Sequence, residues 1–143
     1  MTETIRLGGL ALEFLRSKHD TNGSLDLFRM TVPPAGRMPV PHYHRNWDET
    51  VYGLDGTVTF TVAGVPHAIA AGETLFIPRG TVHGFDNRSG AEAICLCLLT
   101  PGVLGPEYFR EMAAAIAGGP PDPEKMKAIM LRHGLVPAPP APA

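Results

Sequence analysis

Hydrophobic and polar residues alternate along the first hundred positions, a period of two that is typical of β-strands. Threonines alternate with Val58, Phe60 and Val62, and Ala63-Gly64 provides a hairpin turn before the pattern returns. Proline and glycine separate these short runs at close intervals, as in an all-β sandwich or barrel. The predicted strands cover residues 25–32, 57–62, 65–69, 74–77, 82–85 and 93–99.

After Pro101 the apolar spacing changes to that of helices. Pro106 and Glu107 mark the start of a first helix, which Gly118-Gly119-Pro120 ends. Asp122 is placed to cap a second helix, with Gly134 as its stop. We interpret both apolar stripes as packing surfaces. The predicted units are a β-barrel over residues 1–104, a helical extension over 105–136 that packs on the barrel or on a dimer partner, and a disordered tail over 137–143.

The predicted strand at 93–99 is apolar on both faces. Ile94, Leu96 and Leu98 alternate with Cys95, Cys97 and Leu99. A barrel strand normally exposes one polar face, so either the two helices or a second copy of the chain must cover the outer one. We expect a homodimer. The two cysteines lie on one strand face, a poor geometry for a mutual disulfide.

Composition narrows the classes of partner. The chain has 143 residues, 44% hydrophobic and 18% charged, which suits one folded domain. Its 12 basic and 14 acidic side chains give a net charge of −2, without the basic clusters that nucleic acids require. The longest apolar run is far shorter than the ~20 residues of a membrane span, and the first residues lack the pattern of a secretory signal. We therefore expect a cytoplasmic protein that binds a small molecule and neither nucleic acid nor membrane.

Four side chains form a candidate metal site. His42 and His44 are two positions apart, so on a strand both imidazoles point the same way. Glu49 follows a short turn, and His83 lies beyond Pro78-Arg79-Gly80 on a later strand. Imidazole and carboxylate together suit a divalent transition metal. Four protein ligands leave open positions on a six-coordinate ion, whereas they would close a tetrahedral zinc and make it structural. The residues alone leave both geometries possible.

The spacing of these residues resembles the two sequence motifs of the cupins. Gly36-x5-His42-x-His44-x4-Glu49-x6-Gly56 matches the first motif, and Gly72-x5-Pro78-x-Gly80-x2-His83-x3-Asn87 matches the second. The resemblance covers about residues 25–100 and is to small single-domain cupins. It implies a jelly-roll β-barrel, here followed by two short helices. It also implies that His42, His44, Glu49 and His83 bind one metal ion, whether iron, manganese, nickel, copper or zinc. The helical tail is loosely similar to small bacterial quercetinase-like cupins.

An apolar pocket is predicted around the metal site. We expect its walls to include Met38, Val40, Val51, Phe60 and Phe85, which would suit an aromatic or otherwise apolar ligand.

The sequence allows two orientations for the aromatic residues beside the metal ligands. Tyr43, Trp47 and Tyr52 have the opposite parity to their neighbouring ligands. They either pack outward or support those ligands from behind.

Three functions remain open at this point. The first is a metal-dependent dioxygenase for a small aromatic, enol or diketone-like substrate, in which Glu49 is both a metal ligand and a proton acceptor. The second is a metal-dependent lyase or isomerase. The third is a non-catalytic module that binds a small ligand, or a barrel with a structural metal.

Overall fold

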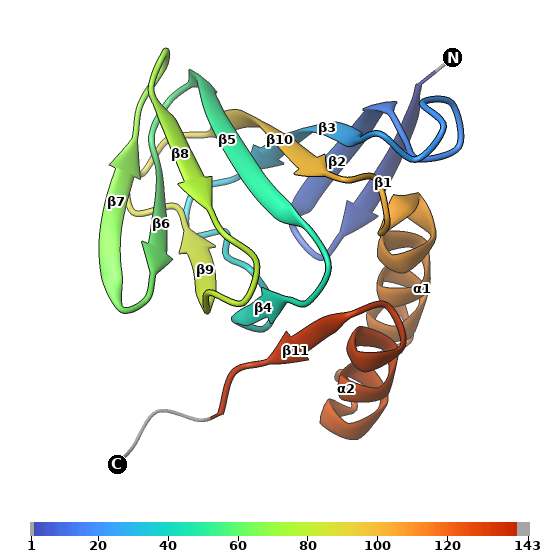
Figure 1. Ribbon diagram of the computed structural model, residues 1–143. Helices are drawn as coiled ribbons and strands as arrows, with labels where there is room; N and C mark the ends of the chain where they lie inside the picture. Colours follow the sequence, from blue (N-terminus) through green and yellow to red (C-terminus); the bar gives the residue numbers. More distant parts are fainter. Residues whose placement is uncertain (1, 140–143) are drawn as a thin grey trace.

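The computed structural model describes residues 2–139, which form two antiparallel β-sheets facing one another and two helices beside them (Figure 1). The strands are β1 (Glu3–Leu7), β2 (Leu10–Arg16), β3 (Asp26–Val32), β4 (His42–His44), β5 (Asp48–Asp55), β6 (Val58–Val62), β7 (Val65–Ile69), β8 (Thr74–Ile77), β9 (His83–Asp86), β10 (Ala93–Thr100) and β11 (Leu135–Pro137). The helices are α1 (Gly105–Ala117) and α2 (Pro123–Arg132).

The strand order is that of a jelly roll with crossed-over connections. One sheet has the order β1-β2-β3-β10-β5-β8, and the other has the order β11-β4-β9-β6-β7. Inward-facing side chains of the two sheets form the core, and buried and half-buried positions alternate regularly along β10. This confirms the predicted all-β fold class with two C-terminal helices.

Local turn chemistry explains why the predicted β6–β7 hairpin forms. Ala63 and Gly64 both have positive φ, 50° and 81°, and Val62 pairs with Val65. Two successive positive φ values match the right-handed twist of the flanking strands. The predicted strands agree with the observed ones to within one or two residues at their ends.

The helices lie against β1 and β11, beside the opening between the sheets (Figure 1). Tyr108 and Met112 of α1 and Met126 and Met130 of α2 are buried there. As predicted, Asp122 caps α2, where its carboxylate accepts a hydrogen bond from the Glu124 amide at 3.0 Å. Among the described residues, neither helix combines the length and apolar character needed to cross a bilayer.

The outward residues of β10 remain half-buried, because the helices pack at the opening between the sheets rather than on that face. The helices therefore do not cover this face. A second copy of the chain is the other predicted cover, and the homodimer stays a prediction.

The C-terminal segment corrects one expectation. Residues 137–143 were expected to be disordered, but Pro137 ends strand β11, and the Ala138 amide donates to the Pro41 carbonyl at 2.9 Å. β11 pairs antiparallel with β4, so that Leu135 lies opposite His44. Residues 140–143 of the predicted tail lie outside the described part of the chain. A segment far along the sequence thus adds an edge strand beside the first two histidines.

Candidate metal centre

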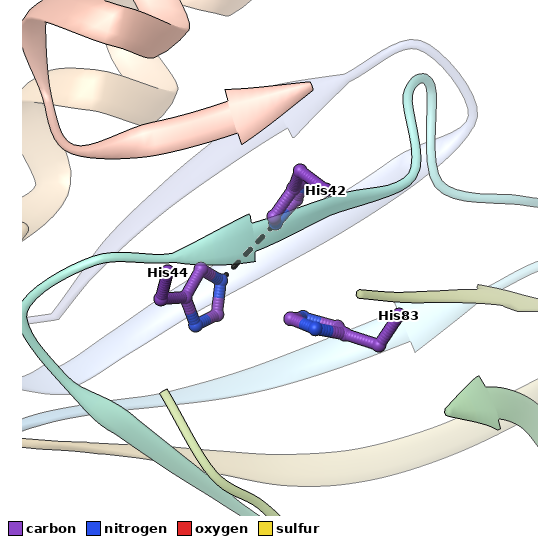
Figure 2. A group of neighbouring side chains, drawn as sticks. All are labelled: His42, His44 and His83. Carbon is purple, nitrogen blue, oxygen red and sulfur yellow. Dashed lines mark hydrogen bonds between the residues drawn. The ribbon is translucent and has the colours of Figure 1, made fainter. Parts of the chain in front are cut away.

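Two neighbouring strands bring the side chains of three histidines together (Figure 2). His42 and His44 are the first and last residues of β4, and both are buried. His83 begins β9 and pairs with His42 across the two strands. The Gly80 amide, in the turn before β9, donates to the His44 carbonyl at 2.8 Å, which fixes that turn beside β4.

The three rings point their nitrogens at a common space. His42 Nε2 and His44 Nε2 are 3.1 Å apart, and one ligand nitrogen from each of the three rings lies within 4.8 Å of the others. Ligands held at about 2.1 Å from one ion stand roughly 3 Å apart at a right angle and roughly 4.2 Å apart when opposite. The 3.1 Å between His42 Nε2 and His44 Nε2 fits two neighbouring ligands of one metal ion, and the 4.8 Å limit brings His83 close enough to join them after a small side-chain adjustment.

Hydrogen bonds at the far side of two rings fix which nitrogens are free to bind. His42 Nδ1 lies 2.8 Å from the Val40 carbonyl oxygen, and His83 Nδ1 lies 3.0 Å from that of Thr81. A carbonyl only accepts, so each Nδ1 carries a hydrogen and each Nε2 presents a lone pair. His83 Nε2 is buried and has no hydrogen-bond partner within residues 2–139. A cation would satisfy it.

Burial keeps these imidazoles neutral. It lowers the pKa of His42 to about 3, with a further contribution from His83. It lowers the pKa of His44 to about 2, with contributions from both neighbouring rings, and it also lowers the pKa of His83. Neutral imidazole is the form that binds metal, so protons compete weakly for this site.

Glu49, near the start of β5, lies beside the histidines. Its Oε1 is 4.0 Å from His44 Nε2 and 3.9 Å from His83 Nε2, too far for hydrogen bonds but within the span of two ligands on one ion. Burial raises the pKa of this carboxyl to about 7, although a hydrogen bond with Cys97 opposes that shift. The sequence-predicted set of His42, His44, Glu49 and His83 is therefore brought together in space.

An apolar cavity of about 70 Å³ adjoins this cluster. Met38, Val40 and Phe85 line it, as expected from the sequence. Val51 and Phe60, also expected in its wall, are instead fully buried in the core beyond it, where Phe60 packs on Phe85 with ring centroids 5.4 Å apart. Their strand faces were predicted correctly, but a period of two does not give the depth along the barrel.

Most of the cavity wall consists of residues that were not predicted from the sequence. The inner face of β1–β3 and the apolar faces of both helices complete it, so the helical extension covers the opening. The apolar spacing in the two helices indicates a surface that packs against the barrel, but it does not show that this surface also lines a cavity. The additional lining residues are Leu7, Leu10, Leu12, Phe28, Met30, Pro39, Cys97, Leu99, Leu104, Tyr108, Phe109, Met112, Met126, Met130 and Leu135.

Comparison with known proteins agrees with this architecture. The model of the family described as "Cupin domain" matches residues 28–99, about half of the chain. Quercetin 2,3-dioxygenase of Bacillus subtilis is 32% identical over 85 residues, which cover 59% of this chain and 25% of that enzyme. The chain spans between 25% and 58% of the length of the curated relatives it matches.

Two solved structures are similar in fold. A predicted oxalate decarboxylase from Thermotoga maritima superposes with a TM-score of 0.61 and 25% identity, over 71% of this chain and 92% of that one. A polyketide cyclase from Streptomyces resistomycificus superposes with a TM-score of 0.60 and 27% identity, over 70% and 72%. These similar proteins differ in the reactions their names describe, so the function must be argued from the site.

Proposed function

Because the chain belongs to the cupin family, we propose that it is a metal-dependent oxidoreductase, a dioxygenase for a small aromatic, enol or diketone-like substrate. One observation carries the proposal: His42, His44 and Glu49 line a cavity whose other walls are almost entirely apolar, and His83 lies against them to complete a set of three imidazoles and a carboxylate. Such a site would bind a ligand that has one or two oxygens at one end and an apolar body.

The donor set suits a divalent transition ion. His42, His44, His83 and Glu49 would hold it, and four ligands leave positions open on a six-coordinate ion. When bound, the ion supplies Lewis acidity and, if it is iron, manganese, copper or nickel, one-electron chemistry. The dioxygenase from Bacillus subtilis, which aligns with 59% of this chain, supports this choice of reaction class.

The chain's own residues would orient the substrate, exclude water from the cavity and transfer a proton. The apolar lining excludes water and leaves the histidine end as the polar part of the wall. Glu49, with a pKa near 7, can accept a proton from an enol or phenol at neutral pH. Tyr108 lines the same cavity, and burial raises the pKa of its hydroxyl, so it stays protonated and can donate a hydrogen bond.

The test is oxygen consumption by untagged protein purified without chelators or a nickel column. Metal content is measured by elemental mass spectrometry, and catechol and acetylacetone, which are small enough for this cavity, are offered as substrates. We expect metal-dependent oxygen uptake with at least one of them. The His83→Gln variant should lose that activity, and His67→Gln, on β7 and outside the cavity lining, should keep it. Fully metal-loaded protein that consumes no oxygen with any of these substrates would overturn the proposal.

A metal-dependent isomerase or lyase is the second candidate. The specific observation in its favour is that Glu49 and Tyr108 line one cavity, Glu49 as a base and Tyr108 as a hydrogen-bond donor to the negative charge that proton removal creates. Tyr108 cannot be assigned to the cavity from the sequence, because it reaches the cavity only through the packing of α1. Turnover that persists under strict anaerobiosis would favour this candidate over the dioxygenase.

A further inference from the structure

The three histidine rings of the candidate metal centre are held in different ways. His42 and His83 each donate Nδ1–H to a backbone carbonyl two residues earlier, which fixes their ring planes. The hydrogen bonds of the described residues give His44 Nδ1 no such partner. His44 instead stacks on the indole of Trp47, with ring centroids 4.7 Å apart and an interplanar angle of 22°.

Trp47 is itself held by its surroundings. It is fully buried, and its Nε1 has no hydrogen-bond partner within residues 2–139, so packing alone fixes the indole. A Cβ added at Gly134 would lie 3.2 Å from Trp47 Cζ3, which shows how closely the backbone before β11 approaches the ring. Gly134 has a φ of +85°, and its carbonyl accepts a hydrogen bond from the Arg45 amide at 3.0 Å.

We propose that Trp47 is the positioning residue for His44: its indole, clamped by the Gly134 backbone, fixes the imidazole plane that hydrogen bonds fix in the other two histidines. Gly134 lies outside the matched cupin region at residues 28–99, so the helical extension takes part in holding a metal ligand. The inference rests on the proposed function, since it needs metal to bind at this site. Groups that orient metal ligands without touching the metal typically change its affinity by about 10- to 100-fold.

Two variants separate positioning from general stability. Trp47→Phe keeps an aromatic ring against His44, whereas Trp47→Leu removes the stack and keeps an apolar side chain. Phe60→Leu is the matched control, because Phe60 is an equally buried aromatic residue outside the cavity lining. The affinity of each metal-free protein for Zn²⁺ is measured by competition with a chromophoric chelator. Thermal unfolding is followed in parallel.

We expect Trp47→Leu to bind Zn²⁺ at least about 10-fold more weakly than the wild type, and Trp47→Phe to recover most of that loss. Phe60→Leu should lower the melting temperature and leave the affinity within about 3-fold. Wild-type affinity in Trp47→Leu, or an equal loss in Phe60→Leu, would overturn the positioning role alone. If the wild type does not bind Zn²⁺, the proposed function and the positioning role both fail.

The single tryptophan of the chain gives an independent readout. Because Trp47 stacks on a ligand ring, Cu²⁺ bound at His44 would lie close enough to quench its fluorescence. We expect saturable quenching with one equivalent of Cu²⁺ in the wild type, whereas His44→Gln should need a large excess of Cu²⁺ for the same quenching. Stoichiometric Cu²⁺ binding, verified by elemental analysis, with unchanged emission would place the ion away from Trp47 and overturn the assignment.

Discussion

The carboxylate of Asp26 accepts a hydrogen bond from the backbone amide of Gly105 at 3.0 Å. Asp26 is fully buried at the start of β3, and its other oxygen accepts from the Lys18 amide at 2.8 Å. One side chain therefore joins the barrel to the first residue of α1 and to the loop after β2. The position of the helical extension over the cavity depends on this buried contact.

We predict that Asp26→Ala is among the most destabilising single changes outside the metal centre. It leaves two amides without an acceptor, and each buried unpaired group costs about 1–3 kcal/mol. The free energy of unfolding in urea should fall by at least about 2 kcal/mol. Asp26→Asn keeps one acceptor oxygen and should lose less. A change below about 0.5 kcal/mol in Asp26→Ala would contradict this interpretation.

Metal affinity should depend on His83 far more than on histidines outside the metal centre. His83→Gln removes one of three imidazole ligands, so we expect the affinity of this variant for Zn²⁺ to fall by more than about 100-fold. That loss exceeds the usual effect of replacing a residue that only orients a metal ligand. Zn²⁺ should raise the melting temperature of the wild type, because it binds only the folded state, and should not raise that of the variant. Calorimetric titration measures the affinity. His67→Gln is the control, and an equal loss there would contradict the site.

The metal-free protein should lose stability on acidification. The folded pKa values of His42, His44 and His83 lie below the unfolded value of 6.5, so their contribution is complete above pH 6.5 and is lost as the pH falls. Glu49, with a folded pKa of about 7 instead of 4.5, has the opposite sign and loses its contribution as the pH rises from 4.5 to 7. Near pH 5.5, unfolding binds about one proton each at His42 and His44 and releases about one at Glu49. His83 adds to the uptake because its pKa is also lowered in the folded state, so the histidines dominate.

This balance predicts a fall in the free energy of unfolding of at least about 1 kcal/mol per pH unit between pH 6 and 5. Urea denaturation at closely spaced pH values measures it in chelator-treated protein. His42→Gln should reduce the slope by roughly one proton, and His67→Gln should leave it unchanged. A flat profile in the wild type would mean that the three imidazoles are not buried in the neutral form.

The outward face of β5, β8 and β10 is where we expect the homodimer to form. Leu96 pairs with Tyr52 and Leu98 with Thr50, which in turn pairs with Phe76, so apolar side chains adjoin across three strands. Phe76 is 56% exposed. Light scattering after size exclusion should give twice the 15.3 kDa chain mass for the wild type.

The control for this prediction lies on a different strand. Leu98→Lys should give the monomer mass, because a charge at the centre of an apolar interface is costly to bury. Val65→Lys, at an exposed apolar position of β7, should remain dimeric. A monomeric wild type at tens of micromolar would refute the interface.

The barrel and the polar end of the site follow closely from the sequence, because both depend on local spacing. The two-residue interval from His42 to His44 fixes one strand face, and the hairpin at Ala63-Gly64 fixes a register. The cavity wall cannot be predicted in the same way, because it depends on how α1 and α2 pack against the finished barrel. β11 was equally hidden: three residues in a proline-rich tail form a strand only because β4 offers them an open edge.

Five methionines, at positions 30, 38, 112, 126 and 130, line the cavity. Unbranched thioether side chains change rotamer at little cost and fill irregular space, whereas the histidines at the other end are fixed. Discrimination between ligands should therefore come from the spacing of the ligand's oxygen atoms and only weakly from the outline of its apolar body. Homologous compounds that share one chelating group but differ in alkyl or aryl substituents should compete for this protein within a narrow range of affinities.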